Sequence, residues 1–120
     1  MDNQIMVVDD DSSLRWTLET ILKDDGRDVI VAEDGYQAIE FANESRIALI
    51  FMDIQMPGIN GVDAFIEIKK ILPECTVVIM TGHALGPLIE KALAEGAKAV
   101  LQKPLSIERL LNIVEEVVPV

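Results

Sequence analysis

The stretch Leu49-Ile50-Phe51-Met52-Asp53-Ile54-Gln55-Met56-Pro57-Gly58 is an apolar run that ends in a carboxylate and is followed by a Pro-Gly turn. A strand that is buried on both faces has such a continuous apolar sequence, and its first polar residue marks where it leaves the core. Asp53 is therefore expected at the carboxyl end of a strand. An Asp in this place most often starts a turn, but a second apolar run, residues 5–8, also ends in acid, at Asp9-Asp10-Asp11.

The length and composition of the chain indicate one soluble globular domain. Half of its 120 residues are hydrophobic and the mean hydropathy is +0.31. A chain of this length builds one core rather than two, so a single domain over residues 1–120 is expected. The longest apolar run, residues 47–52, is far too short to span a membrane, and the amino terminus lacks the basic start of a secretory signal. We therefore expect a cytoplasmic protein without membrane contact.

The net charge limits the possible binding partners, and the cysteine content bears on the compartment. A formal net charge of -11 disfavours direct binding of this domain to nucleic acid or anionic lipid. A role directed at DNA would need another domain. The single cysteine, Cys75, cannot form an internal disulfide, which fits a reducing compartment.

Five short apolar runs alternate with segments of helical periodicity. The runs are residues 5–8, 29–32, 47–52, 77–80 and 99–101. Residues suited to cap or stop a helix stand at the ends of the segments between them: Asp11 or Ser12, Gly26, Pro73, Gly96 and Ser106. Strict alternation predicts parallel strands with helices on both faces of the sheet. The expected fold class is α/β, a doubly wound five-stranded parallel sheet of flavodoxin-like (βα)5 type with strand order 2-1-3-4-5.

In this architecture ligands bind outside the carboxyl ends of the strands, between strands 1 and 3. Asp9, Asp10 and Asp53 flank that crevice. Three converging carboxylates repel one another unless some are protonated or a cation neutralises them. Oxygen ligands without His or Cys suit a hard cation, and few ligands with room for water favour Mg²⁺ over Ca²⁺. The alternative is a solvated acidic loop without an ion.

The fourth and fifth strands add complementary groups to the same edge. Thr81 places a hydroxyl there, and Lys103 places an ammonium group, with a cis Lys103-Pro104 peptide as one way to turn the lysine inward. A cation, a lysine, a hydroxyl and backbone N–H groups together can hold a tetrahedral oxyanion, as phosphoryl transfer requires. Because an Asp can act as the nucleophile toward phosphorus, the edge is interpreted as a phosphate acceptor.

Four motifs stand in a fixed order: Val7-Val8-Asp9-Asp10-Asp11, residues 53–61, Met80-Thr81-Gly82-His83 and Lys103-Pro104. Together they resemble the receiver domain of bacterial two-component response regulators, over essentially the whole chain. The resemblance implies a signalling domain, not an enzyme with a separate substrate. It implies that Asp53 takes a phosphoryl group from a sensor histidine kinase or a phosphotransfer protein.

The same resemblance implies roles for the other residues of the site. Asp10, Asp53 and the backbone carbonyl of Gln55 would bind Mg²⁺ directly, and Asp9 would act through water. Thr81 and Lys103 would contact the phosphoryl oxygens. His83 either lines the entrance or is an ordinary loop side chain, and it lacks the neighbours of a phosphotransfer histidine.

Within the family, Asp11-Ser12-Ser13-Leu14-Arg15-Trp16 and residues 80–83 are most similar to the nitrogen-regulation (NtrC-like) type. Such receivers usually precede an ATPase and a DNA-binding domain, which implies a role in transcription regulation. Many receivers carry Tyr or Phe three residues before the lysine, and that ring turns inward on activation. Val100 stands there instead, so an aromatic switch is excluded. Trp16 either lies near the face where a kinase docks or serves packing.

The expected response to phosphorylation is a population shift in residues 82–95. Phosphate on Asp53 would favour a state in which Thr81 approaches it. The surface formed by the fourth helix, the fifth strand and the fifth helix would then change. It is the expected contact for an output domain, an effector or a phosphorylation-dependent homodimer, and it includes Lys91, Val100 and Arg109.

Two other classes of function are weighed against this interpretation. An aspartate-nucleophile phosphohydrolase would use Asp9 and Asp11 as its Asp-x-Asp motif, with Thr81 and Lys103, but it needs an acidic pair that only Glu115-Glu116 could supply, in the wrong place. A flavodoxin-type module for flavin or nucleotide needs a Gly/Ser/Thr-rich loop after the first strand. Three aspartates occupy that loop instead.

Overall fold

The computed structural model describes residues 3–82 and 86–119. Within these residues the chain forms five strands and five helices in strict alternation. The strands are β1 (Gln4–Val8), β2 (Asp28–Ala32), β3 (Leu49–Asp53), β4 (Thr76–Thr81) and β5 (Ala99–Gln102). The helices are α1 (Ser12–Asp24), α2 (Gly35–Glu44), α3 (Gly61–Ile71), α4 (Gly86–Ala94) and α5 (Ile107–Val117).

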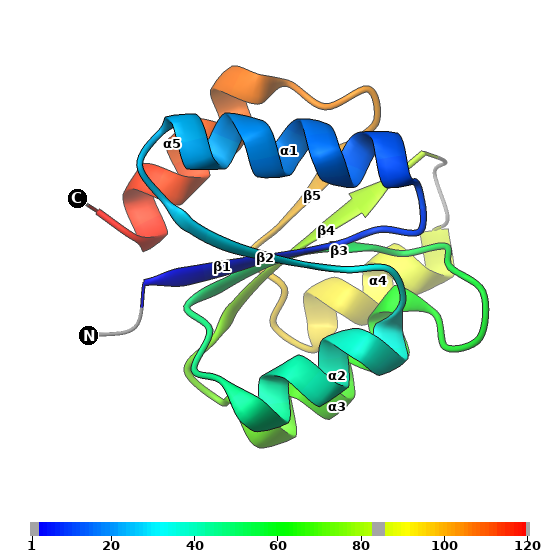
Figure 1. Ribbon diagram of the computed structural model, residues 1–120. Coiled ribbons are helices and arrows are strands. Elements are labelled where there is room, and N and C mark those ends of the chain that lie inside the picture. Colours follow the sequence, from blue (N-terminus) through cyan, green and yellow to red (C-terminus); the bar gives the residue numbers. More distant parts are fainter. Residues whose placement is uncertain (1–2, 83–85, 120) are drawn as a thin grey trace.

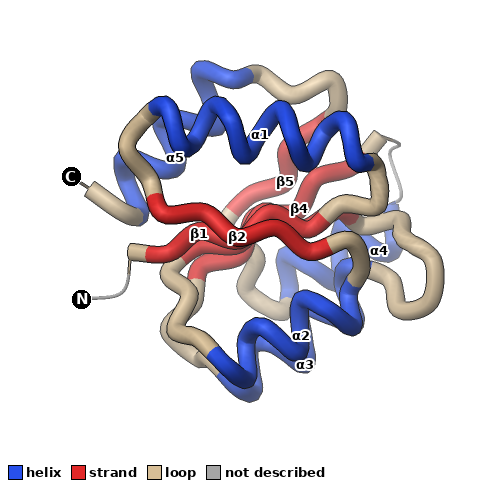
Figure 2. The backbone as a smooth tube through the Cα atoms, in the orientation of Figure 1, coloured by secondary structure: helices blue, strands red, loops and turns tan. Residues whose placement is uncertain are grey.

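The strands form one parallel sheet in the order β2-β1-β3-β4-β5. Helices α1 and α5 cover one face, and α2, α3 and α4 cover the other, with the sheet between them (Figures 1 and 2). The predicted fold class and strand order are confirmed. Among the described helices, none has the length and apolar character needed to cross a membrane.

The sheet separates two apolar cores, because successive side chains of a strand point to opposite faces. On β3, Ile50 and Met52 pack with α2, α3 and α4, whereas Leu49 and Phe51 pack with α1 and α5. All four side chains are fully buried. The continuous apolar run that predicted a two-faced strand is thus used on both sides.

The helix ends follow the predicted caps. Asp11 caps α1 by accepting hydrogen bonds from the N–H groups of Ser13 and Leu14, and Ser106 caps α5 by accepting one from Arg109. Helices α1, α3 and α4 end before the predicted stop residues, which are Gly26, Pro73 and Gly96. The side chains of Asp11 and Ser106 satisfy backbone N–H donors that the first turn of a helix leaves without partners.

The start of one strand and the apolar face of one helix differ from the prediction. Strand β3 begins at Leu49, not at Ile47, which is buried in the connection before it. An apolar run indicates which residues are buried, not which residues pair in a sheet. Here the buried segment begins at Ile47, two residues before the strand. On α4, the helical spacing of four residues predicts one apolar stripe, which consists of Leu88, Ile89, Ala92 and Leu93. Of these only Ala92 is buried, and Leu93 is 50% exposed.

Candidate functional site

The carboxyl edge of the sheet gathers four of the predicted site residues. Asp53 and Thr81 are the last residues of β3 and β4, Asp9 directly follows β1, and Lys103 directly follows β5. Parallel pairing aligns these strand ends, since Met80 lies opposite Asp53 and Gln102 lies opposite Thr81. Asp9, Asp53 and Thr81 are buried polar residues. Order in the sheet, not nearness in the sequence, therefore builds the site.

Asp10 completes an acidic cluster at this edge. One carboxylate oxygen from each of Asp9, Asp10 and Asp53 lies within 4.8 Å of the others, and Asp10 is the exposed member. The donors are all hard oxygens, and the site faces solvent at Asp10, where water can complete a coordination shell. This donor set fits a divalent cation of the magnesium or calcium type.

Lys103 reaches into the acidic cluster. Its Nζ lies 2.8 Å from Asp9 Oδ2 and 3.5 Å from Asp53 Oδ1. The Lys103-Pro104 peptide is cis, which is the arrangement that the sequence left open as one way to turn the lysine inward. Lys103 thus bridges the carboxylates that follow β1 and end β3, and its ammonium group lies beside one carboxylate oxygen of Asp53.

The pKa values of the site reflect burial and mutual charge. Burial, followed by the charge of Asp9, raises the pKa of Asp53 from 3.8 to about 6, although Lys103 and a hydrogen bond from the Gln55 N–H oppose this. Burial lowers the pKa of Lys103, but its hydrogen bond to Asp9 and the charges of Asp53 and Asp9 outweigh burial and raise it overall. Near neutral pH the lysine is charged and Asp53 is ionised in most molecules.

The loop after β1 is fixed by hydrogen bonds. The Asp9 N–H donates to the Ala32 carbonyl at 3.2 Å, and the Asp11 N–H donates to Asp9 Oδ1 at 2.9 Å. Arg15, one turn into α1, donates to the Asp9 carbonyl at 2.7 Å. Arg15 was not singled out from the sequence. Its position four residues after the N-cap was the available signal, because helical side chains lean toward the amino end.

The loop after Asp53 lies close to the strand end. The Gly61 N–H donates to the Ile54 carbonyl at 3.0 Å, and a methyl group on Gly61 would lie only 2.0 Å from the Asp53 carbonyl oxygen. Only glycine allows this approach. The Gln55 side chain is exposed, and the role of its carbonyl as a metal ligand stays a prediction.

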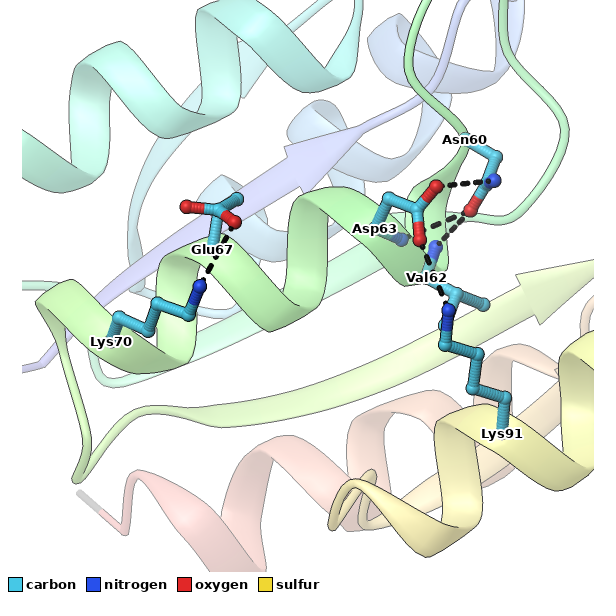
Figure 3. Close-up of polar contacts among 6 residues, drawn as sticks. All are labelled: Asn60, Val62, Asp63, Glu67, Lys70 and Lys91. Atoms are coloured by element: carbon cyan, nitrogen blue, oxygen red, sulfur yellow. Dashed lines mark hydrogen bonds and ion pairs between the residues drawn. The ribbon is translucent and has the colours of Figure 1, made fainter.

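A polar network connects this loop to α4 (Figure 3). Asn60 caps α3 and accepts from the N–H groups of Val62 and Asp63, while its Nδ2 donates to Asp63 Oδ2 at 3.0 Å. The other oxygen of Asp63 lies 3.4 Å from Lys91 Nζ on α4. Lys91, predicted to lie on the responsive surface, is therefore linked to the loop that follows Asp53.

The remaining predicted residues lie around or away from the site. Val100 is half-buried on β5, and Trp16 is 67% exposed on α1. His83 falls outside the described residues. Glu115 and Glu116 pair with Arg27 and Lys98, at 2.8 and 2.9 Å, so neither joins the acidic cluster. This placement removes the acidic pair that a phosphohydrolase would need.

A hollow of about 520 Å³ lies at the opposite edge of the sheet, where β3 and β4 begin. Cys75 lines it, and burial raises the pKa of this thiol to about 12. A thiol that stays protonated is a poor nucleophile. The candidate functional site therefore lies at the carboxyl edge of the sheet and not in this hollow.

The sheet order and the acidic edge define a doubly wound α/β domain with a carboxylate and lysine site at its topological switch point. A family model described as "Response regulator receiver domain" matches residues 5–115. Chemotaxis protein CheY of Bacillus subtilis (strain 168) is 32% identical over 97% of this chain and 98% of its own length. The chain belongs to the receiver domains of two-component response regulators.

Two further similarities describe its relation to longer proteins and to solved structures. The DNA-binding transcriptional regulator NtrC of Escherichia coli (strain K12) is 34% identical over 95% of this chain and 24% of its own length. A CheY-like receiver domain protein from Methanospirillum hungatei JF-1 superposes with a TM-score of 0.92 at 25% identity, covering 97% of this chain and 93% of the other. The chain spans about half the length of several curated relatives it matches. Since NtrC and CheY are nearly equally similar, support for the nitrogen-regulation subgroup is weak.

Proposed function

We propose that Asp53 is the phosphoacceptor of this receiver domain and that Mg²⁺ is its metal. Asp10, Asp53 and the Gln55 carbonyl would bind the ion directly, and Asp9 would act through water. The observation that carries the proposal is the convergence of three carboxylates and Lys103 at one edge of the sheet. A bound ion would neutralise the carboxylates and the charge that develops on the phosphoryl oxygens.

Each of four residues at the site then has a defined task. An oxygen of ionised Asp53 forms a bond to phosphorus, while the bond from phosphorus to the leaving group of the donor breaks, which leaves an acyl phosphate on Asp53. Lys103, already 3.5 Å from Asp53 Oδ1, pairs with a phosphoryl oxygen. Thr81 ends the neighbouring strand and contacts a second phosphoryl oxygen through its hydroxyl. Asp9 keeps Lys103 directed into the site before phosphate arrives.

The donor and the output follow from the family. We propose a sensor histidine kinase or a phosphotransfer protein as donor, and an output domain or effector that binds the α4-β5-α5 surface, with transcription regulation as the outcome and a phosphorylation-dependent homodimer as one form of it. Lys91 on α4, which pairs with Asp63 on α3, and half-buried Val100 on β5 belong to the proposed surface. The strong negative charge supports a domain that acts through protein partners and does not itself bind nucleic acid.

Intact mass spectrometry tests the central step. The protein is incubated with acetyl phosphate and Mg²⁺ beside the variants Asp53→Asn, Asp10→Asn and Asp28→Asn. We expect one phosphoryl adduct in the wild type, none in Asp53→Asn, and an adduct in Asp10→Asn only at higher Mg²⁺ concentrations. Asp28 is exposed at the start of β2, so Asp28→Asn controls for the loss of one negative charge.

The outcomes separate the proposals. An adduct that persists in Asp53→Asn would place the acceptor elsewhere, and an adduct that forms equally well in EDTA would remove the metal from the mechanism. Release of phosphate over many turnovers from a simple phosphate ester would instead favour the phosphohydrolase.

A further inference from the structure

The turn that follows Asp53 is contacted from the side by the first residues of α2. A methyl group on Gly58 would lie 2.8 Å from Cε2 and 3.5 Å from Cδ2 of Tyr36, so the tyrosine ring lies directly against the turn. A methyl group on Gly35 would lie 2.5 Å from Ile59 Cγ2 and 3.4 Å from the Ile59 carbonyl oxygen. Two consecutive residues of α2 therefore contact two consecutive residues of the turn.

The turn itself has a conformation that needs support. Gly58 has a φ of +82°, in the left-handed region that L-residues rarely adopt. The glycine has no side chain with which to anchor itself, and the neighbouring Pro57 is exposed. Contact with the Tyr36 ring replaces the packing that a side chain in the turn would otherwise provide.

The first turn of α2, which carries Tyr36, is held in place by hydrogen bonds. Asp34 caps α2 by accepting a hydrogen bond from the Gln37 N–H at 2.8 Å, and the Gln37 side chain accepts one from the Glu33 N–H at 2.8 Å. Ala38 and Ala42 bury the helix in the core. Tyr36 is 62% exposed, so its ring adds little to the core while one part of it touches the turn.

We propose that Tyr36 is a positioning residue for the cation site. Its ring holds the turn at Gly58 in one conformation, and so keeps the main chain of Gln55, three residues earlier, ready to serve a cation bound by Asp10 and Asp53. This inference rests on the proposed function, since it assigns Tyr36 a task in the binding of Mg²⁺. Tyr36 acts through the turn, and its side chain is not itself a ligand of the metal or of the phosphate.

Calorimetric titration with Mg²⁺ tests the inference on the whole 120-residue chain. Tyr36→Ala is expected to weaken Mg²⁺ binding about tenfold, as the loss of groups that orient metal ligands does. Tyr36→Phe keeps the ring and is expected to bind Mg²⁺ with wild-type affinity. Trp16→Ala removes another highly exposed aromatic side chain, from α1, and is the matched control with unchanged affinity.

Two further measurements separate positioning from general destabilisation. The Tm of Tyr36→Ala should lie within about 3 °C of wild type, because truncation of an exposed side chain costs little. Amide hydrogen exchange of residues 54–60 in the metal-free protein should nevertheless be faster in Tyr36→Ala than in Tyr36→Phe. Equal affinity in Tyr36→Ala and wild type, or equal loss in Tyr36→Phe, would overturn the inference.

The same experiments distinguish failure of the inference from failure of the proposed function. Wild-type protein that binds Mg²⁺ and forms the acyl phosphate, with Tyr36→Ala indistinguishable from it, removes only the role of Tyr36. Wild-type protein that shows no heat of Mg²⁺ binding and no adduct overturns both.

Discussion

At the scale of single residues, Asp53 is a carboxylate under opposing influences. Burial and the charge of Asp9 favour its protonated form, while Lys103 and the Gln55 N–H favour the ionised form. Burial and the charge of Asp9 outweigh the other two influences, and the pKa of Asp53 rises to about 6. Under the proposed function Asp53 must be ionised to attack phosphorus, and its pKa lies close to the pH range in which a bound cation has a large effect on its charge.

This raised pKa makes stability depend on pH in a defined direction. The folded pKa of Asp53 exceeds the unfolded value, so the folded state binds the proton more tightly, and ionised Asp53 disfavours folding above pH 6. The metal-free wild type should therefore gain about 1 kcal/mol of unfolding free energy between pH 7 and pH 5 relative to Asp53→Asn. Urea unfolding of both proteins in EDTA at the two pH values measures this difference. A difference that stays constant between them would contradict the raised pKa.

The sequence predicted the residues of the acidic edge better than the residues that support them. Asp9, Asp53 and Lys103 were found because each follows an apolar run, and parallel pairing forces strand ends together. Tyr36 and Arg15 act through side-chain contacts with neighbouring loops. Such contacts depend on reach and direction in space, which periodicity does not encode.

At the scale of elements, α4 is the helix that is least fixed by the core. Among its described residues only Ala92 is buried, and Leu93 is 50% exposed. The sequence pattern predicted a wider apolar stripe, because it counts hydrophobic side chains without regard to how much of the neighbouring surface is available. The Asp63–Lys91 pair (Figure 3) gives α4 a polar link to α3.

Loss of that pair should loosen α4 locally. We expect Lys91→Ala to speed amide exchange in α4 about twofold and to change the global free energy of unfolding by less than about 1 kcal/mol, because both partners are half exposed. Lys98→Ala is the matched control, since Lys98 pairs with Glu116 on α5 and its loss should leave α4 unchanged. Hydrogen exchange followed by mass spectrometry compares the three proteins. Identical exchange in α4 for both variants would show that the pair does not restrain the helix.

At the scale of the whole molecule, the proposed cation site predicts that cation binding and folding are coupled. A cation that binds only the folded chain relieves the repulsion among Asp9, Asp10 and Asp53. At a Mg²⁺ concentration of 100 times Kd the stabilisation is about 2.7 kcal/mol, which raises Tm by roughly 10 °C for a domain of this size. Calorimetric scans with Mg²⁺, with excess EDTA and with NaCl at matched ionic strength measure the gain. It should be absent with NaCl and smaller in Asp10→Asn, and an equal gain from NaCl would indicate screening only.

The residues gathered at the carboxyl edge of the sheet come from positions 9, 10, 53, 81 and 103, and Lys103 contacts Asp9 across 94 positions of the chain. Contacts between residues so far apart in sequence carry a large loop-closure cost and depend on the rest of the topology. A partly folded chain, or one whose last strand has not docked, has Asp53 but lacks Lys103 and the aligned neighbouring strand end beside it. Under the proposed function, phosphoryl transfer therefore requires the completed sheet, and a nascent or damaged molecule is not expected to accept phosphate until folding has finished.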